Sequence, residues 1–151
     1  MFYAQGEPRH ELRLTRIIPA SPEEVFEAWS TAESMKQWFC PEGSTVLSIE
    51  LDVRVGGTFR IDVQHADAGK MVIHGVYREV APPERLAFTW ISTHTRFRES
   101  LVTLNFLARG EATELILFQT ELPDEETVQW HVAGWTELLD LLVAVWSTQN
   151  P

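Results

Sequence analysis

The amino-acid sequence predicts an α+β fold in which a curved antiparallel sheet of about seven strands wraps around one long C-terminal helix. Three observations predict it: a wide apolar stripe at helical spacing in 124–147, alternating segments between turn residues in 45–120, and two helix-capping signatures before them. No repeat or linker interrupts this order. We therefore expect a single domain at 10–151, after a loose tail at 1–9.

The first predicted elements are a strand and two short helices. Apolar and polar residues alternate from His10 up to Pro19, as in a strand. Ser21 can then cap a helix that begins at Pro22, and Glu24 completes a capping box. A second capping signature follows at once in 30–33 and indicates a break. We therefore expect two short helices in a V, the second ending near residue 38.

From residue 45 to residue 123, the sequence predicts mostly strands joined by tight turns. The expected strands lie in 45–51, 58–64, 71–80, 86–90, 102–106 and 115–119. Turn residues separate them, such as Gly56-Gly57 and Asp67-Ala68-Gly69. Because the connections are short, consecutive strands should pair in antiparallel fashion, and a sheet of this size twists and coils.

The last predicted helix begins at Asp124 and is apolar around most of its circumference. Such a helix needs a concave surface to cover it, and the inward face of the sheet supplies one. Gly134 would allow the helix to approach the sheet, with Trp135 beside it bordering a ligand space. A coiled sheet and a straight helix meet closely at one end and diverge at the other, so we expect a cavity between them.

The expected cavity lining consists of inward-facing strand residues, one face of the last helix, and two aromatic residues that close the open end. These residues are Trp38, Phe39, Phe59, Ile61, His74, Phe88, Trp90, Leu104, Gln119, Trp135, Leu138, Leu139 and Leu142. Trp38 and Phe39 would close the end, and His74 and Gln119 would be polar groups inside. Sparse polar groups in an apolar cavity are typical of a binding site for a small hydrophobic or amphipathic molecule.

Composition and motifs exclude several other classes of function. The formal net charge of −10 disfavours nucleic acids and anionic membranes as partners. Cys40 is the only cysteine, so no internal disulfide forms and a reducing compartment fits. The N-terminus lacks the pattern of a signal peptide, and Asp140 interrupts the longest apolar run. We therefore expect a cytoplasmic protein, either a monomer or a homodimer.

No residue pattern predicts a catalytic or metal site. The five histidines do not form the short-spaced pairs of zinc sites, and Cys40 has neither a partner nor a cationic neighbour. No serine lies in a nucleophile-elbow pattern. We therefore expect no metal, no cofactor and no defined reaction.

Four stretches together resemble a known family. They are ASPEEVF at 20–26 with Trp29, VGGTF at 55–59, GVYREV at 75–80 followed by PPERL and FTW up to 90, and Gly134-Trp135 with Leu138-Leu139. In order and spacing they are similar to the activator of heat-shock protein 90 ATPase homologue-like family, in its short single-domain form. That family lies in the START-like (SRPBCC) superfamily of the birch-pollen allergens. The resemblance implies a helix-grip fold with a ligand cavity.

The resemblance also implies two alternatives to simple ligand binding. The first is a protein-interaction module that acts on a chaperone in the stress response, with the acidic helix starts as its contact surface. The second is an aromatase/cyclase-like or hydrolase-like enzyme acting in the cavity. Gln119 stands where family members often carry a histidine, a departure that weakens the transfer of a polar pocket residue. We favour binding over catalysis.

Overall fold

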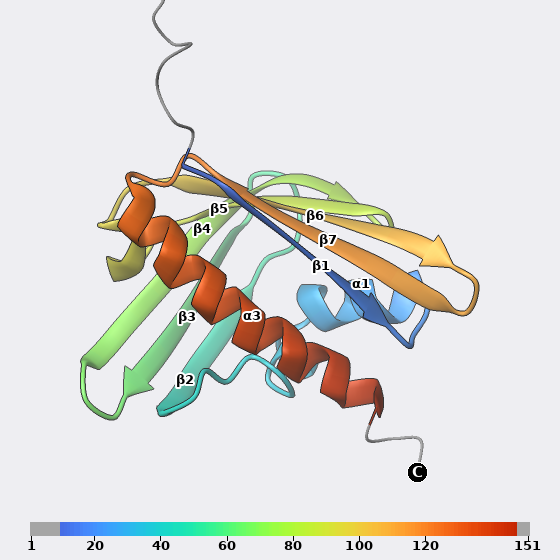
Figure 1. Ribbon diagram of the computed structural model, residues 1–151, viewed down its shortest axis with the longest axis horizontal. Helices are drawn as coiled ribbons and strands as arrows, with labels where there is room; N and C mark the ends of the chain where they lie inside the picture. The colour runs from blue at the N-terminus through green and yellow to red at the C-terminus, as the bar shows by residue number, and fades with distance from the viewer. Residues whose placement is uncertain (1–9, 148–151) are drawn as a thin grey trace, which may run out of the picture.

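The computed structural model describes residues 10–147, which form one antiparallel sheet that curves around a long C-terminal helix (Figure 1). The elements, in chain order, are β1 (Leu12–Ile18), α1 (Pro22–Ser30), α2 (Ala32–Met35), β2 (Ser44–Leu51), β3 (Thr58–His65), β4 (Gly69–Ala81), β5 (Arg85–Trp90), η2 (Thr93–Thr95), β6 (Ser100–Arg109), β7 (Ala112–Thr120) and α3 (Glu125–Ser147). The predicted fold class and helix-grip architecture are confirmed. The predicted tail at 1–9 lies outside the described residues.

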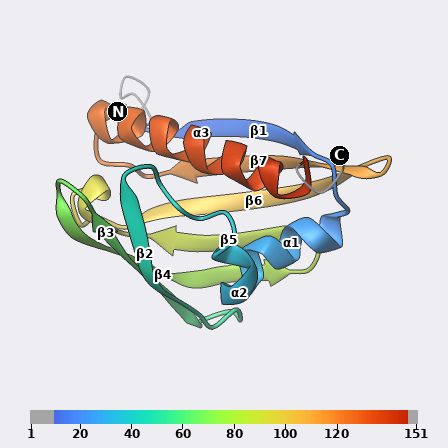
Figure 2. The ribbon, with the colours of Figure 1, turned by 90° about the horizontal axis from the view of Figure 1, so that it is seen from below.

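The seven strands are ordered β1-β7-β6-β5-β4-β3-β2 in the sheet. Strands β2 to β7 form a meander of hairpins, and β1 adds to the outer side of β7 with Leu14 opposite Leu117. Figure 2 shows α3 running along β1 and β7, with α1 and α2 near the end at which α3 finishes. The β3–β4 hairpin and η2 lie near the end at which α3 begins.

The two short helices begin where their caps predict. Ser21 Oγ accepts a hydrogen bond from the Glu24 amide at 3.2 Å, and Glu24 Oε1 accepts one from the Ser21 amide at 3.1 Å. Thr31 ends α1 and caps α2, because its hydroxyl accepts from the Ser34 amide. The predicted break into two short helices is therefore present. The second helix, α2, ends at Met35, and hydrogen-bonded turns follow it to Phe39.

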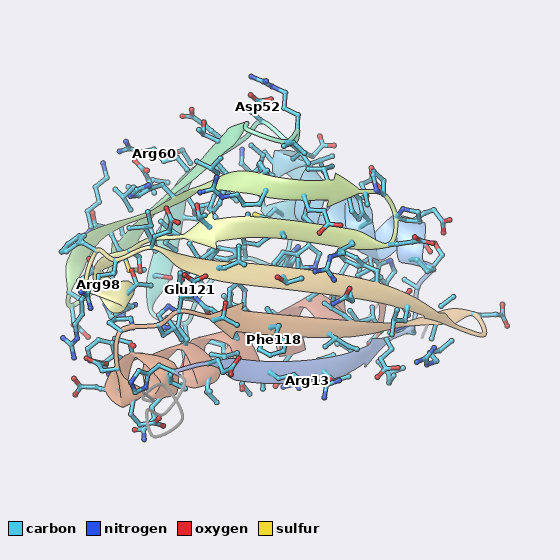
Figure 3. The ribbon with its side chains drawn as sticks, turned by 90° about the horizontal axis from the view of Figure 1, so that it is seen from above. Arg13, Asp52, Arg60, Arg98, Phe118 and Glu121 are labelled. Atoms are coloured by element: carbon cyan, nitrogen blue, oxygen red, sulfur yellow. The ribbon has the colours of Figure 1, made fainter. Side chains whose placement is uncertain are left out.

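The core lies between the concave face of the sheet and the helices. Every second residue is buried from Ser100 to Phe106 in β6 and throughout β7, including Leu104 and Leu117, and α3 contributes Leu139 and Leu142. Gly75 is required where β4 passes β5, because a Cβ there would lie 1.9 Å from the Thr89 carbonyl oxygen. The opposite face of the sheet is free of helices (Figure 3).

Candidate functional site

A cavity of about 350 Å³ lies between the first half of α3, the β3–β4 hairpin, η2 and the loop before β2. The sheet coils away from α3 at this end of the molecule, and the hairpin and η2 form the facing walls. Its apolar lining includes Phe39, Val63, Met71, Ile73, Trp90, Trp135 and Leu138, and its polar lining includes Ser44, Ser92, Thr93, Lys70, Glu42, Glu137 and three histidines. Most of the wall is aromatic or aliphatic, as in small-molecule sites.

Two tryptophans form the inner wall and are held by buried hydrogen bonds. The ring centroids of Trp90 and Trp135 are 4.9 Å apart. Trp135 Nε1 donates to Gln119 Oε1 at 2.8 Å, and Gln119 Nε2 donates to Ser100 Oγ at 2.9 Å. Ser100 Oγ in turn donates to the carbonyl of Trp90 at 2.7 Å. Gln119 thus links both tryptophans and fixes the orientation of the Trp135 indole.

The cavity is also lined by three histidines from three separate elements. His65 comes from the end of β3, His94 from η2, and His131 from the second turn of α3. The pKa of His94 is lowered, chiefly by burial and then by the nearby His65. The pKa of His131 is lowered mainly by burial and further by His94, although its bond to the Thr127 carbonyl opposes the shift. Near neutral pH both imidazoles are therefore uncharged.

Local hydrogen bonds determine which nitrogen of two histidines carries the proton. His131 Nδ1 lies 2.7 Å from the Thr127 carbonyl oxygen, which can only accept, so Nδ1 carries the hydrogen and Nε2 has a lone pair. His65 Nδ1 accepts from the backbone amides of Asp67 and Ala68 at 3.1 and 3.2 Å. The neutral His65 ring therefore carries its hydrogen on Nε2.

Two charged residues of the lining, Lys70 and Glu137, are already engaged. Lys70 Nζ lies 3.3 Å from a carboxylate oxygen of Asp62. Glu137 Oε2 accepts a hydrogen bond from the Glu42 amide at 2.6 Å and so ties α3 to the loop before β2. Between residues 10 and 147, no group of three or more His, Cys, Asp and Glu side chains is arranged to hold a metal ion.

The structure brings part of the predicted lining together. Phe39, Trp90, Trp135 and Leu138 line the cavity. Trp38, Leu104, Gln119, Leu139 and Leu142 are buried in the core instead, and Trp38 Nε1 donates to the Ala28 carbonyl. Phe59, Ile61 and Phe88 border a separate void of only about 10 Å³. Phe39 and Trp90 also border this void, so they separate it from the cavity.

The prediction for His74 is wrong. His74 is exposed on the outer face of β4, opposite Arg60 of β3, because the alternate residues Ile73, Gly75 and Tyr77 face the core. Figure 3 labels Arg60 on the helix-free side of the sheet. His74 is therefore no part of the cavity.

The role predicted for Gly134 is also wrong. A Cβ added at Gly134 would meet no atom within 4 Å, so this glycine does not mark a close approach of helix and sheet. His131 and Leu138, one turn to either side on the same face of α3, line the cavity together with Gly134. The missing side chain therefore adds open volume to the cavity.

The sequence does not mark these three histidines as neighbours, because they are far apart along the chain and lack metal-ligand spacing. One signal was available for His131, which lies three residues after Val128 and four before Trp135 on the apolar stripe of α3. No comparable signal marks His65 or His94, since His65 ends a strand, His94 lies in a 3₁₀ turn, and the direction of both depends on the fold.

The curved antiparallel sheet, the two short helices after the first strand and the gripped C-terminal helix define a START-like protein with the helix-grip fold. A family model for activator of Hsp90 ATPase homolog 1-like proteins matches residues 19–147. The chain belongs to this family, as the four sequence stretches indicated.

Solved structures of bacterial proteins agree with this assignment. The AHSA1 protein from Silicibacter pomeroyi is 30% identical over 93% of this chain and 99% of that one, with a TM-score of 0.80. A protein from Chromobacterium violaceum is 28% identical over 90% of this chain and 96% of that one, with a TM-score of 0.79. A search among curated proteins found no sequence match. Within residues 10–147, no helix is both long and apolar enough to span a membrane.

Proposed function

We propose that the chain binds a small hydrophobic or amphipathic molecule in the cavity between α3, η2 and the β3–β4 hairpin. The observation that carries this proposal is the cavity of about 350 Å³ with its largely apolar lining. Ligand sites commonly enclose roughly 300–1,000 Å³ and are mostly apolar with a few placed polar groups. This volume fits a molecule of one to three rings or a short branched chain.

Two features favour a site formed before the ligand arrives. The Trp135 indole is held by the buried Gln119 carboxamide, and the loop before β2 is held to α3 through Glu137. A wall that is already ordered loses little conformational entropy on binding, which favours affinity. None of the polar groups forms a nucleophile–base pair among the described residues, so binding without a reaction is the function we propose.

A fluorescence titration with N-phenyl-1-naphthylamine, an uncharged probe that brightens in apolar surroundings, tests the proposal. Gly134→Phe should fill the cavity and weaken probe binding at least about tenfold, because a side chain at this position enters open space. Phenylalanine is also no worse than glycine in a helix, so the fold should persist. Ala133→Phe, on the exposed face of the same helix, is the matched control and should bind like the parent chain. Equal binding by both variants would contradict the proposal.

The family name supports a second candidate, a module that contacts a chaperone. Such a module needs an exposed apolar surface. Phe97, which is 74% exposed, and Trp130 lie near the start of α3, and the Arg96 guanidinium lies 5.0 Å from the Trp130 ring centroid. Part of the predicted acidic contact surface is engaged, because Arg96 pairs with Asp124 and Glu126.

A chaperone ATPase assay with a pull-down from lysate distinguishes the two candidates. A protein-interaction module should raise the ATPase rate, and Phe97→Ser should abolish that effect without changing probe binding. No rate change and no captured chaperone would leave ligand binding as the function. The prediction of a cytoplasmic location belongs to both candidates and is tested by fractionation of the source cells.

A further inference from the structure

The polar groups of the cavity offer complementary hydrogen-bonding roles. His131 presents a lone pair on Nε2, because its Nδ1–H is committed to the Thr127 carbonyl. His65 also lines the cavity, and its neutral ring carries the hydrogen on Nε2, because its Nδ1 accepts from the backbone amides of Asp67 and Ala68. A ligand that satisfies both must donate a hydrogen bond to one imidazole and accept one from the other. A hydroxyl group does both, whereas a carboxylate only accepts.

The charges around the cavity disfavour an anion. Apart from the histidines, Lys70 is the only cationic side chain among the described residues that line it, and Asp62 pairs with its ammonium group at 3.3 Å. Glu42 and Glu137 line the cavity with carboxylates. Burial holds His94 and His131 in the uncharged form near neutral pH, as their lowered pKa values indicate. An anion entering this cavity would lose its hydration without gaining an unpaired cation.

The apolar walls favour a flat ligand. Phe39, Trp90 and Trp135 line one continuous aromatic surface, with ring centroids 6.5 Å apart for the first pair and 4.9 Å for the second. Aromatic rings gain energy from offset or edge contacts with such a surface beyond the burial of area alone. A saturated chain would bury area but would make none of these ring contacts.

We infer that the cavity selects an uncharged aromatic molecule that carries a hydroxyl group, with the hydroxyl hydrogen donated to His131 Nε2 and its oxygen accepting from His65 Nε2–H. The inference deepens the proposed function and rests on it. It specifies the chemical class of the ligand: phenols and aromatic alcohols, in preference to aromatic carboxylates and to unsubstituted aromatic hydrocarbons.

Calorimetric titration with three probes of similar shape tests this inference near neutral pH. The probes are 2-naphthol, 2-methylnaphthalene and 2-naphthoate, which carry a neutral hydroxyl, a methyl group and an anion. We expect 2-naphthol to bind about tenfold more tightly than either of the others, since one or two added hydrogen bonds are worth a factor of this order. Tightest binding of 2-naphthoate, or equal binding of 2-naphthol and 2-methylnaphthalene, would overturn the inference.

Two variants assign the preference to the histidines. His131→Leu should lose the preference for 2-naphthol over 2-methylnaphthalene, and the exposed His74→Leu should keep that preference. If His131→Leu fails to fold, His65→Leu provides the same test, because it removes the Nε2–H group that would donate to the hydroxyl oxygen. A preference that persists in the folded variant overturns the inference. Binding of 2-methylnaphthalene by the parent chain reports separately on the proposed function, and if none of the three probes binds, both proposals fail.

Discussion

Replacing Gln119 by leucine should lower the free energy of unfolding by about 2–4 kcal/mol. The Gln119 side chain is 0% exposed and bridges Trp135 Nε1 and Ser100 Oγ at 2.8 and 2.9 Å. Leucine has a similar volume, so the change removes hydrogen bonds and creates little empty space. The indole N–H then loses its acceptor, and a buried unsatisfied group costs about 1–3 kcal/mol. Ser100 loses one of its two hydrogen bonds, worth about 0.5–1.5 kcal/mol, and keeps the bond to the Trp90 carbonyl. Urea unfolding followed by far-UV circular dichroism measures the loss without relying on tryptophan fluorescence.

A double-mutant cycle isolates the hydrogen bond between Gln119 and Trp135. Trp135→Phe alone leaves Gln119 Oε1 without its donor, whereas the combination with Gln119→Leu removes both partners. The double variant should therefore lose at least about 1 kcal/mol less than the sum of the two single losses. Gln64→Leu, the same change at an exposed glutamine of β3, should remain within about 0.5 kcal/mol of the parent chain. Additive single losses, or a Gln119→Leu loss no larger than that of the control, would refute the reasoning.

Two further predictions concern α3. Leu142→Ala should lower the free energy of unfolding, measured in urea, by about 2–5 kcal/mol because Leu142 is 0% exposed. Leu141→Ala, at a position that is 37% exposed, should lower it far less. Equal losses in the two variants would mean that the sheet does not cover α3 as described. The pKa of His131 is lowered in the folded chain, whereas in the unfolded chain a histidine has its ordinary pKa of about 6.5. Below pH 6.5 the unfolded chain therefore binds more protons than the folded chain. The free energy of unfolding should fall as the pH decreases from about 6.5 toward the folded pKa. His131→Gln should flatten this pH dependence of stability between neutral and mildly acidic pH, whereas the exposed His74→Gln should not. Identical profiles of stability against pH for the parent chain and both variants would contradict the prediction.

The fold could be predicted because its signals are local and repeated. Alternation along β3, β5, β6 and β7 places Phe59, Trp90 and Leu104 in the core, where burial confirms them. The capping residues Ser21 and Thr31 determine where the short helices begin, because their side chains satisfy backbone amides within three residues. Each of these features depends on neighbours along the chain or on the period of the element.

The orientation of β4 could not be predicted from its own pattern. Valine and isoleucine occupy both faces of 71–80, so a period of two does not distinguish the inner face from the outer. The structure resolves this through Gly75, which lies against the Thr89 backbone and leaves no space for a side chain on the inner face. Register there depends on the neighbouring strand, and for that reason the pattern of β4 alone predicts the wrong side for His74.

The polar side of the cavity depends on contacts between distant parts of the chain. His65, His94 and His131 are far apart in the sequence and meet only because a hairpin, a 3₁₀ turn and a helix surround the same space. The hydrogen-bonding role of His131 comes from the Thr127 carbonyl one turn earlier in α3, and that of His65 from the two amides that follow it. The volume of the cavity has a different origin, since it includes the space left open at Gly134. Affinity for apolar probes and preference for a hydroxyl group should therefore respond to different substitutions, Gly134→Phe for the first and His131→Leu for the second.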